Sequence, residues 1–386
     1  MATWQLDPDT THLNHASFGA TPVEVLQHQS ELRAQLEANP VDFFQRRYQP
    51  LLEGSRAALA SFINADPAGL VFVPNATYGV NSVLRSLEPR LRRGCEIIIT
   101  NHTYNACRNA AAETAQRVGG TLVVADIPFP LASPSQAASA VLDAVTPETA
   151  LVVLDHVTSA TGLVLPIEEI AADLEPDVTV LIDGAHAPGM VEVDISAIGA
   201  SFYTANCHKW ICSPKGAGFV WVDDYHRPVT RAAVVSHGYN DGWPGSESTF
   251  HAQFDWTGTD DPTARLCVGT ALQIMDEHRP GGWSSLRASN HELVLEGRSL
   301  IAHALRIKLP APDNMIGSIA SLQIPEHVAP GRSASHLVEW LHTEWAVEVP
   351  ISPWPTDSDR LLRISGQQYN LLSDYERLAS ALLSLK

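Results

Sequence analysis

The sequence has little positive charge and no long apolar run. Lysine and arginine together number 25 against 43 aspartates and glutamates, so the formal net charge is −18 over 386 residues. Such a chain repels phosphodiester backbones and anionic membrane surfaces, and no local run of Lys and Arg offsets the acidity. No apolar stretch approaches the length needed to span a bilayer. We therefore expect no nucleic-acid partner and no membrane partner.

Cysteine is scarce and shows no paired pattern. The five cysteines are an odd number without a C-x-x-C pair: Cys95, Cys107, Cys207, Cys212 and Cys267. This pattern favours a reducing compartment over a disulfide framework. The first residues, MATWQLDPDTTHLNH, lack the basic start and the apolar stretch of a signal peptide. Together these features predict a cytoplasmic protein.

Several motifs of common enzyme classes are missing or misplaced. The sequence has no G-x-S-x-G, so a nucleophile-elbow hydrolase lacks its main signal. The spacing of Cys207, His208 and Cys212 matches no standard zinc site, and we expect no metal. The loop 213–218, SPKGAG, looks like a phosphate loop but precedes a β-rich run, whereas dinucleotide and Walker loops follow a strand.

The composition is that of an ordinary globular protein, with 45% hydrophobic and 18% charged residues. A chain of this length predicts two lobes. In the first two thirds, near-continuous apolar runs alternate with helical patterns such as 104–118 and 166–174, which predicts an α/β lobe around a mostly parallel sheet. The predicted strands are 71–74, 96–100, 121–125, 150–155, 178–183, 201–204 and 218–222.

The remaining sequence predicts an amino-terminal arm over 1–20, a large domain over 21–277 and a smaller α+β domain over 278–386 that ends in an amphipathic helix, 372–385. Residues 234–262 are rich in glycine and aromatics with little periodicity, and long irregular segments are usually functional. Their aromatic residues (Tyr239, Trp243, Phe250 and Trp256) indicate either a substrate larger than a bare amino acid or packing at a dimer interface.

Reactive side chains follow two of the predicted strands. Strand 178–182 leads into Asp183, and strand 201–204 is soon followed by Lys209. Ligands of α/β sheets bind at the carboxyl ends of the strands, so this acid and this amine can face one ligand. Pyridoxal phosphate needs such a pair: a lysine for the Schiff base and an aspartate that keeps the pyridine nitrogen protonated.

A phosphate group needs a cradle, and residues 74–81 offer one. Asn75 or Thr77 can cap the helix that follows strand 71–74, and free N–H groups at a helix start bind anions. Tyr104, at the start of the helix after strand 96–100, can stack on a planar cofactor. Each feature alone is also typical of ordinary capping or packing.

Taken together, the motifs resemble the aminotransferase class V superfamily of fold-type I pyridoxal phosphate enzymes, and within it the isopenicillin-N-epimerase-like branch. The resemblance covers nearly the whole chain. Its most specific elements are DGAHAPG (183–189) and CHKW (207–210) in this order. The supporting elements are LNHASFG (13–19), PNATYGVN (74–81), DHVTSATGLVLP (155–166), FDWTGTDDPTA (254–264) and LRISGQQYN (362–370). The resemblance implies the fold-type I fold, with a large domain around a mostly parallel, seven-stranded type of sheet.

The resemblance also implies roles for individual residues. Lys209, Asp183 and His186 are expected to be catalytic. The residues expected to bind the cofactor are Asn75, Ala76, Thr77, Tyr104, Ser159, Asp183, His186, His208, Lys209, Gly258 and Thr259. Thr158 or Ser159 stands where many relatives carry an asparagine to the cofactor's 3′-oxygen, so that contact is open. Gly258 and Thr259 resemble the segment that reaches a neighbouring subunit's phosphate, which implies a homodimer with shared sites. Arg363, with Asn14 and His15, is expected to bind the α-carboxylate of an amino-acid-type substrate.

The implied activity is chemistry at the α-carbon of an amino acid or amino-acid conjugate. It would proceed through a Schiff base on Lys209 and a quinonoid carbanion. C–S β-elimination and epimerisation stay equally open, with decarboxylation (possibly oxidative) or transamination as alternatives on the same scaffold. Cysteine desulfurases of this superfamily carry a reactive cysteine before the carboxy-terminal arginine. This chain has no cysteine between Cys267 and Arg363, which disfavours that activity. A non-enzymatic cofactor-binding protein is disfavoured because the lysine, aspartate and arginine are all present.

Overall fold

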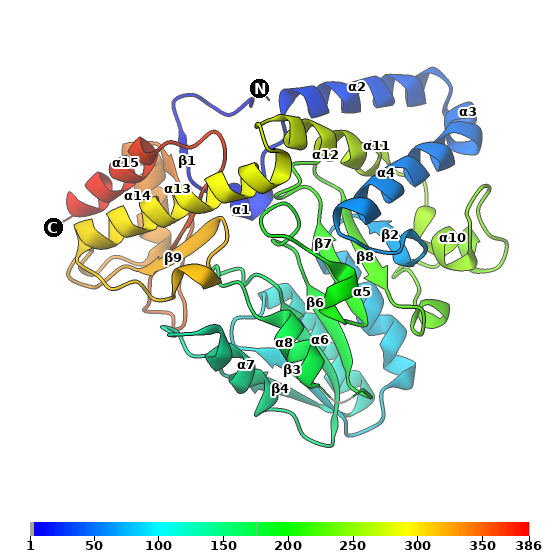
Figure 1. The fold of residues 1–386 in the computed structure, drawn as a ribbon, viewed down its shortest axis with the longest axis horizontal. Coiled ribbons are helices and arrows are strands. Elements are labelled where there is room, and N and C mark those ends of the chain that lie inside the picture. Colours follow the sequence, from blue (N-terminus) through cyan, green and yellow to red (C-terminus); the bar gives the residue numbers. More distant parts are fainter. Residues whose placement is uncertain (1–3, 175, 386) are drawn as a thin grey trace.

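A seven-stranded sheet forms the centre of the molecule (Figure 1). The computed structural model describes residues 4–174 and 176–385. The strand order is β2-β8-β7-β6-β5-β3-β4, and β8 alone runs antiparallel to its neighbours, so the predicted mostly parallel sheet is confirmed. The strands are β2 (Leu70–Val73), β3 (Glu96–Thr100), β4 (Thr121–Ala125), β5 (Thr149–Asp155), β6 (Thr179–Asp183), β7 (Phe202–Asn206) and β8 (Gly218–Val222).

The sheet is covered on both faces, as its continuous apolar runs require. Side chains alternate along a strand, so successive residues face opposite layers. Ile97, Leu151 and Leu181 belong to the cluster that includes helices α5 (Ala76–Leu87) and α6 (Asn105–Val118). Ile98 and Val152 belong to the other cluster, together with α7 (Pro134–Leu142) and α8 (Ile167–Asp173). Burial of both faces leaves the carboxyl edge of the sheet as the place for a ligand.

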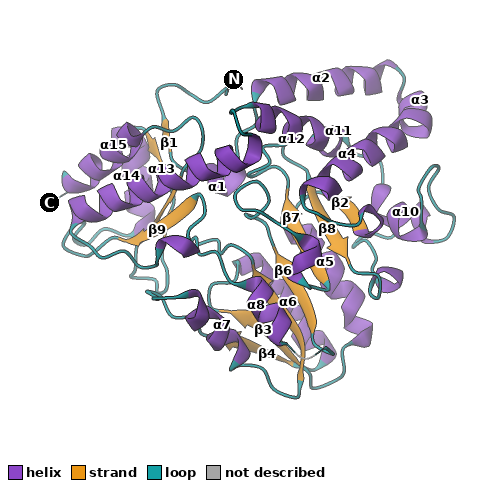
Figure 2. Cartoon of the chain, in the orientation of Figure 1, coloured by secondary structure: helices purple, strands orange, loops and turns teal. Residues whose placement is uncertain are grey.

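The other helices frame this sheet and build the carboxy-terminal layer (Figure 2). They are α1 (His15–Phe18), α2 (Val23–Ala38), α3 (Pro40–Asp42), α4 (Tyr48–Phe62), α9 (Ile195–Ile198), α10 (Thr249–Asp255), α11 (Thr263–Leu266), α12 (Val268–Glu277), α13 (Gly282–Leu305), α14 (Ala334–Trp345) and α15 (Leu372–Leu383). Most expected boundaries differ from these by one or two residues, because helix and strand ends depend on capping.

A separate three-stranded antiparallel sheet lies in the carboxy-terminal part, in the order β11-β12-β9. Its strands are β9 (Ile319–Gln323), β11 (Ile351–Ser352) and β12 (Leu361–Ser365). The amino-terminal arm joins this part of the molecule: β1 (Thr11–His12) pairs in parallel with β10 (Val347–Glu348). The fold thereby agrees with a large α/β unit and a smaller α+β unit. The boundary at 277/278 stays a prediction, and residues 1–3 and 386 lie outside the described range.

Residues 234–262 are less irregular than the sequence predicts. They contain α10, whose start is capped by the Ser248 hydroxyl, which accepts from the His251 amide. The rings of Trp243 and Trp256 stack with their centroids 3.9 Å apart, and Phe250 is buried in the core. Trp243, Trp256 and Phe250 are therefore used for packing, whereas Tyr239 is exposed.

Two features are absent from the described residues. No helix among them has the length and apolarity needed to cross a bilayer. No group of three or more His, Cys, Asp or Glu side chains within the same range is arranged to hold a metal ion.

A buried ion pair joins α4 to the end of α10. The Arg56 guanidinium donates to Asp255 Oδ1 at 2.8 Å, and both side chains are almost fully buried. Replacing Arg56 by Met leaves the Asp255 carboxylate buried without its partner, which costs about 3–5 kcal/mol. We expect a fall of that size in the free energy of unfolding, measured by urea titration.

The exposed pair Arg46–Asp42 is the matched control, with side chains 68% and 37% exposed. Arg46→Met should change the free energy of unfolding by less than about 1 kcal/mol. Equal effects of the two substitutions would contradict a structural role for the buried pair. The double variant Arg56→Met/Asp255→Leu should recover part of the loss, because it removes the uncompensated charge.

Candidate active site

The carboxyl edge of the sheet opens into a cavity of about 380 Å³. Asp155 at the end of β5 and Asp183 at the end of β6 are direct partners in the sheet register. Asn206 ends β7, and the loop after it carries His208 and Lys209. The cavity is lined by Ala16, Ser17, Phe18, Asn75, Ala76, Thr77, Tyr104, Asp155, Val157, Ser159, Asp183, Ala185, His186, Asn206, His208, Lys209 and Arg363. Its size is that of a small-molecule site.

The amine of Lys209 is held in a form suited to nucleophilic attack. Burial lowers the pKa of Lys209 to about 8, an effect that nearby Asp183 partly opposes and Arg363 reinforces. Its Nζ lies 3.0 Å from His186 Nε2. Burial and the neighbouring Lys209 lower the pKa of His186 well below its usual value, so this imidazole is neutral. A neutral imidazole can accept a hydrogen bond from the amine.

Asp183 is oriented from two sides. Its Oδ1 accepts from the Ala185 amide at 2.9 Å, and its Oδ2 accepts from the Cys107 thiol at 3.0 Å. Burial and the nearby Asp183 carboxylate raise the pKa of Cys107 well above its usual value, which keeps the thiol protonated and able to donate. Cys107 therefore helps to orient the Asp183 carboxylate.

The start of α5 has the form of an anion site. Asn75 Oδ1 accepts from the Tyr78 amide, and Asn206 Oδ1 accepts from the Ala76 amide, both at 2.9 Å. These caps fix the first turn, in which the Thr77 amide lies between the two capped positions. Asn75, Ala76 and Thr77 all line the cavity, as the predicted phosphate turn requires.

Arg363 is a buried cation surrounded by neutral oxygens. Its Nη1 donates to the Ser159 carbonyl at 2.7 Å, and its Nη2 donates to the Ser17 hydroxyl at 2.8 Å. The Asn14 amide oxygen lies 3.4 Å from Nη2. Burial without a carboxylate lowers the pKa of Arg363 to about 10, and Nε has no hydrogen-bond partner among the described residues. Such a guanidinium is suited to a ligand carboxylate.

The two residues expected to assist Arg363 lie in different places. Asn14 contacts the guanidinium, whereas His15 is completely buried and does not line the cavity. His15 Nε2 lies 3.0 Å from the Lys209 carbonyl and Nδ1 lies 3.0 Å from the Tyr369 hydroxyl. A direct substrate contact by His15 is therefore a wrong assignment, because the ring is used to hold the backbone of Lys209.

Thr158 and Ser159 differ in what their side chains contact, while the contact of either with the cofactor's 3′-oxygen stays a prediction. The Thr158 hydroxyl is fully buried and is engaged by Thr161 Oγ1 at 2.7 Å and the Leu163 amide at 2.8 Å. Ser159 lines the cavity next to Arg363. Tyr104 and His208 line it as well; Tyr104 is half-exposed, and burial lowers the pKa of His208 to about 4.

Two predicted features lie outside this cavity. Gly258 and Thr259 are exposed and do not line it, so a role toward a neighbouring subunit stays a prediction. The aromatic residues of 234–262 do not line it either, which removes the argument that they accommodate a larger substrate in this cavity.

Several residues at the site escaped the sequence analysis, among them Asp155, Asn206 and Cys107. Asp155 and Asn206 end β5 and β7, the strands on either side of β6, so the rule that identified Asp183 also applies to them. Burial and the neighbouring Asp183 raise the pKa of Asp155 well above its usual value. Cys107 follows Tyr104 by three residues, a spacing that places both on one face of α6.

The cavity fits pyridoxal phosphate part by part. Lys209 offers an amine for the aldehyde, Asp183 a carboxylate for the pyridine nitrogen, and the first turn of α5 its amides for the phosphate. Asp155 Oδ2 and His186 Nδ1 are buried at the cavity without partners among the described residues. Unpaired buried polar atoms are costly, and their presence indicates a site built for a polar ligand.

Comparison with known proteins agrees with this chemistry. The family model "Aminotransferase class-V" matches residues 12–327. The chain is 31% identical to isopenicillin N epimerase from Amycolatopsis lactamdurans, over 98% of this chain and 96% of the relative. It is 32% identical to putative L-cysteine desulfhydrase 1 from Oryza sativa subsp. japonica, over 97% of this chain and 82% of the relative.

Two solved structures of C-DES share the fold at 21% identity and a TM-score of 0.81. One is a mutant with glycine covalently linked to the PLP cofactor, and it covers 98% of this chain and 97% of its own. The other shows the cystine C–S lyase with its reaction product cysteine persulfide, and it covers 97% of this chain and 98% of its own.

The lowered pKa of Lys209 predicts how the apoprotein captures the cofactor. Only the neutral amine attacks an aldehyde, and a pKa of about 8 leaves roughly one tenth of it neutral at pH 7, against roughly one in 3,000 for an unshifted lysine. The rate of Schiff-base formation, followed by stopped-flow absorbance, should rise about tenfold between about pH 7 and 9 and then level off. A steady rise beyond that range would contradict the lowered pKa, and Lys209→Ala is the blank.

Proposed function

The chain belongs to the aminotransferase class-V family, and from that premise we propose that it cleaves the C–S bond of an S-substituted L-cysteine by β-elimination. Water is consumed, and the products are pyruvate, ammonia and a free thiol. The observation that carries the proposal is the hydrogen-bonded pair Lys209 and His186, 3.0 Å apart, in the cavity that also contains Arg363. Elimination needs one proton acceptor at the α-carbon and a carboxylate anchor, and the cavity has both.

Family membership and nearly full-length relatives confirm the predicted resemblance and its cofactor, pyridoxal phosphate. When bound, this cofactor supplies an electron sink for the electron pair left at the α-carbon. Asp183 is the carboxylate placed for the pyridine nitrogen, and the Cys107 thiol and the Ala185 amide hold it in position. A negative charge at that nitrogen keeps it protonated, which strengthens the sink.

Arg363 and Lys209 act on the substrate itself. The guanidinium binds the α-carboxylate bidentately and thereby fixes the direction of the Cα–H bond. The Lys209 amine, released by the substrate amine, accepts the α-proton as general base, which its lowered pKa favours near neutral pH. His186 accepts a hydrogen bond from Nζ and holds it, and the protonated Lys209 then returns its proton to the departing thiolate.

The cysteines support elimination over sulfur transfer to the protein. All five are buried. Cys107, which donates to the Asp183 carboxylate, has a pKa raised well above the usual value. A persulfide-forming cysteine must be an accessible thiolate. Cysteine desulfurase activity is therefore disfavoured, in line with the missing cysteine before Arg363.

Epimerisation at the α-carbon is the second candidate. It is favoured by the 31% identity to an epimerase over 98% of this chain and by the half-exposed Tyr104 hydroxyl group at the same cavity, which offers a second proton donor. Elimination is placed first because a desulfhydrase matches at 32% identity and because the Lys209–His186 pair alone suffices for it. A homodimer with shared sites and a cytoplasmic location belong to the proposal as well.

The first test compares the absorption of the purified protein with that of Lys209→Ala. A borohydride-sensitive band near the visible edge should be present in the wild type and absent from the variant. Addition of an S-substituted L-cysteine should then release pyruvate and thiol in equal amounts from the wild type alone. The amounts are measured with a lactate dehydrogenase assay and a thiol reagent.

The outcome separates the candidates. Racemised substrate that has exchanged its α-proton in D₂O, without thiol release, would replace elimination by epimerisation. A keto acid that retains the sulfur substituent would indicate transamination, and release of carbon dioxide would indicate decarboxylation. A protein that shows no band after incubation with pyridoxal phosphate would overturn the whole assignment.

The carboxylate anchor generates its own prediction. Arg363→Lys keeps the charge but loses the bidentate geometry, so kcat/KM for elimination should fall roughly 10- to 100-fold. The control ligand is the corresponding S-substituted cysteamine, which lacks the carboxylate and should bind both proteins equally, as judged by the cofactor spectrum. An equal loss of cysteamine binding would show that Arg363 only supports the fold.

A further inference from the structure

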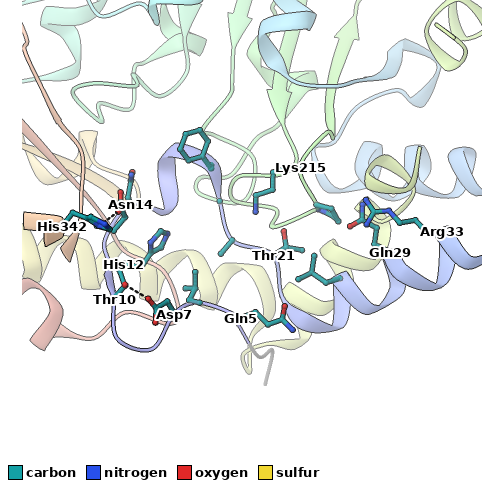
Figure 3. A pocket seen from close by; sticks show the side chains of 17 residues that line it. Gln5, Asp7, Thr10, His12, Asn14, Thr21, Gln29, Arg33, Lys215 and His342 are labelled. Carbon is teal, nitrogen blue, oxygen red and sulfur yellow. Dashed lines mark hydrogen bonds and ion pairs between the residues drawn. The ribbon is translucent and has the colours of Figure 1, made fainter. Parts of the chain in front are cut away.

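A second cavity of about 760 Å³ is lined largely by the amino-terminal arm and α2 (Figure 3). We call it the arm cavity. It is lined by residues 5–7, 10, 12, 14 and 18–21 of the arm, by Leu26, Gln29 and Arg33 of α2, and by Pro214, Lys215, His342 and Glu348. The residues that hold the cofactor and bind the α-carboxylate leave this space unused.

The arm cavity and the active-site cavity meet at α1. Phe18 lines both, and its ring is 74% exposed. Asn14 lines the arm cavity, and its Oδ1 accepts from Arg363 of the active site. An exposed side chain changes rotamer within nanoseconds, so Phe18 does not block passage from one cavity to the other. A molecule anchored at Arg363 can therefore extend into the arm cavity.

One cation that lines the arm cavity, Lys215, is left without a partner. Arg33 is paired with Asp261 at 2.7 Å, and His342 lies 3.4 Å from Glu348. Asp7 accepts from the Thr10 hydroxyl at 2.8 Å and from the Asp9 amide at 3.1 Å. Lys215 is in none of the ion pairs or hydrogen bonds found over residues 4–174 and 176–385.

The position of Lys215 directs this charge inward. Its side chain descends from the loop before β8 into the space between His12 and Thr21 (Figure 3). It comes from the SPKGAG loop, whose position before a strand does not fit a nucleotide site. Burial lowers the pKa of Lys215 below its usual value. The pKa of His12 is also lowered, by burial first and by the nearby Lys215 as a smaller cause. Lys215 is exposed to the solvent of the cavity and makes no ion pair, so its ammonium group is available to a ligand anion.

We propose that the arm cavity binds the distal part of the substrate and that Lys215 pairs with a carboxylate at its far end. The inference rests on the proposed function and narrows it: the preferred substrate is an S-substituted cysteine whose substituent is a flexible chain ending in a carboxylate. Arg363 holds the α-carboxylate, the chain passes Phe18, and the distal carboxylate lies between Lys215 and the arm.

The test uses the holoenzyme and a series of S-(carboxyalkyl)-L-cysteines of increasing length, each beside its neutral carboxamide. Affinity is measured as the change of the cofactor spectrum on binding, and KM and kcat are measured from thiol release. Once the chain is long enough to reach Lys215, the carboxylate should bind about tenfold more tightly than the amide. The difference should lie in KM and not in kcat, because the contact is remote from the reacting bond.

Substitutions locate the effect. Lys215→Gln should abolish the preference for the carboxylate, and Lys215→Glu should reverse it toward the amide. Arg33→Gln is the matched control: Arg33 lines the same cavity, but its charge is already paired, so the preference should persist. Equal affinity for carboxylate and amide in the wild type, or a preference that survives in Lys215→Gln, would overturn the proposal.

A second readout does not depend on turnover. The chain has only four lysines, so each can be followed by peptide mass spectrometry after brief acetylation of the holoenzyme. The carboxylate ligand at about ten times its Kd should lower acetylation of Lys215 about tenfold, because about nine tenths of the sites are then occupied, while the amide, which makes no ion pair with the amine, should protect it less. The exposed Lys308 serves as the internal standard. If no thiol is released but Lys215 is protected, the proposed elimination is wrong and the proposed role of the arm cavity is supported. If thiol is released without protection of Lys215 and without a preference for the carboxylate, elimination is supported and the role of the arm cavity is wrong.

Discussion

The burial of one guanidinium without a carboxylate is the constraint on which the site depends. An arginine removed from water needs compensation, and here two distant segments of the chain supply only neutral oxygens: the arm, with the Asn14 amide and the Ser17 hydroxyl, and the loop with the Ser159 carbonyl. These oxygens orient Arg363 but leave its charge uncompensated, as the lowering of its pKa to about 10 shows. A substrate carboxylate completes the arrangement. Binding and positioning are thus one event, because the group that gains most from the ligand also fixes its orientation.

The amino-terminal arm makes this constraint possible. It pairs with β10 through Thr11 and His12, and the Ser365 amide donates to the Leu13 carbonyl, so the arm is attached to the strand that carries Arg363. On its other side, His15 contacts the Lys209 carbonyl, and Gly19, with φ of 71°, packs so closely that a Cβ would lie 2.1 Å from the His208 carbonyl. Only glycine fits there at low cost. The arm therefore sets the distance between the lysine and the arginine.

Local patterns predicted the parts of the fold and the site that local rules control. Strands β3 and β4 agree with the expected ranges because apolar runs between polar residues define them, and Asp183 and Lys209 follow strands that the same runs mark. The burial of His15 could not be read from LNHASFG, because it depends on Tyr369, 354 positions away in the chain. The aromatic segment 234–262 was expected to be irregular for the same reason. Trp243 and Trp256 stack on each other although they are distant in the sequence, and no periodicity reveals such a contact. Thr158 and Ser159 were separated only by their contacts with Leu163 and Arg363.

The net charge sets the electrostatic potential far from the protein surface, whereas a bound ligand interacts mainly with the charged groups next to it. A net charge of −18 opposes anions, yet the cofactor is a phosphate and the proposed substrates are carboxylates. Salt screens exposed charges beyond about 8 Å at physiological ionic strength, so the acidic surface acts weakly on a ligand that has entered the cavity. Inside, Arg363 and Lys209 are buried and are screened far less. Lys215 extends the same logic into the arm cavity, where it is the one cation left without a partner among the charged residues described there. An acidic protein can thus bind acidic molecules where cations without an acidic partner line its cavities, as Arg363 and Lys215 do here.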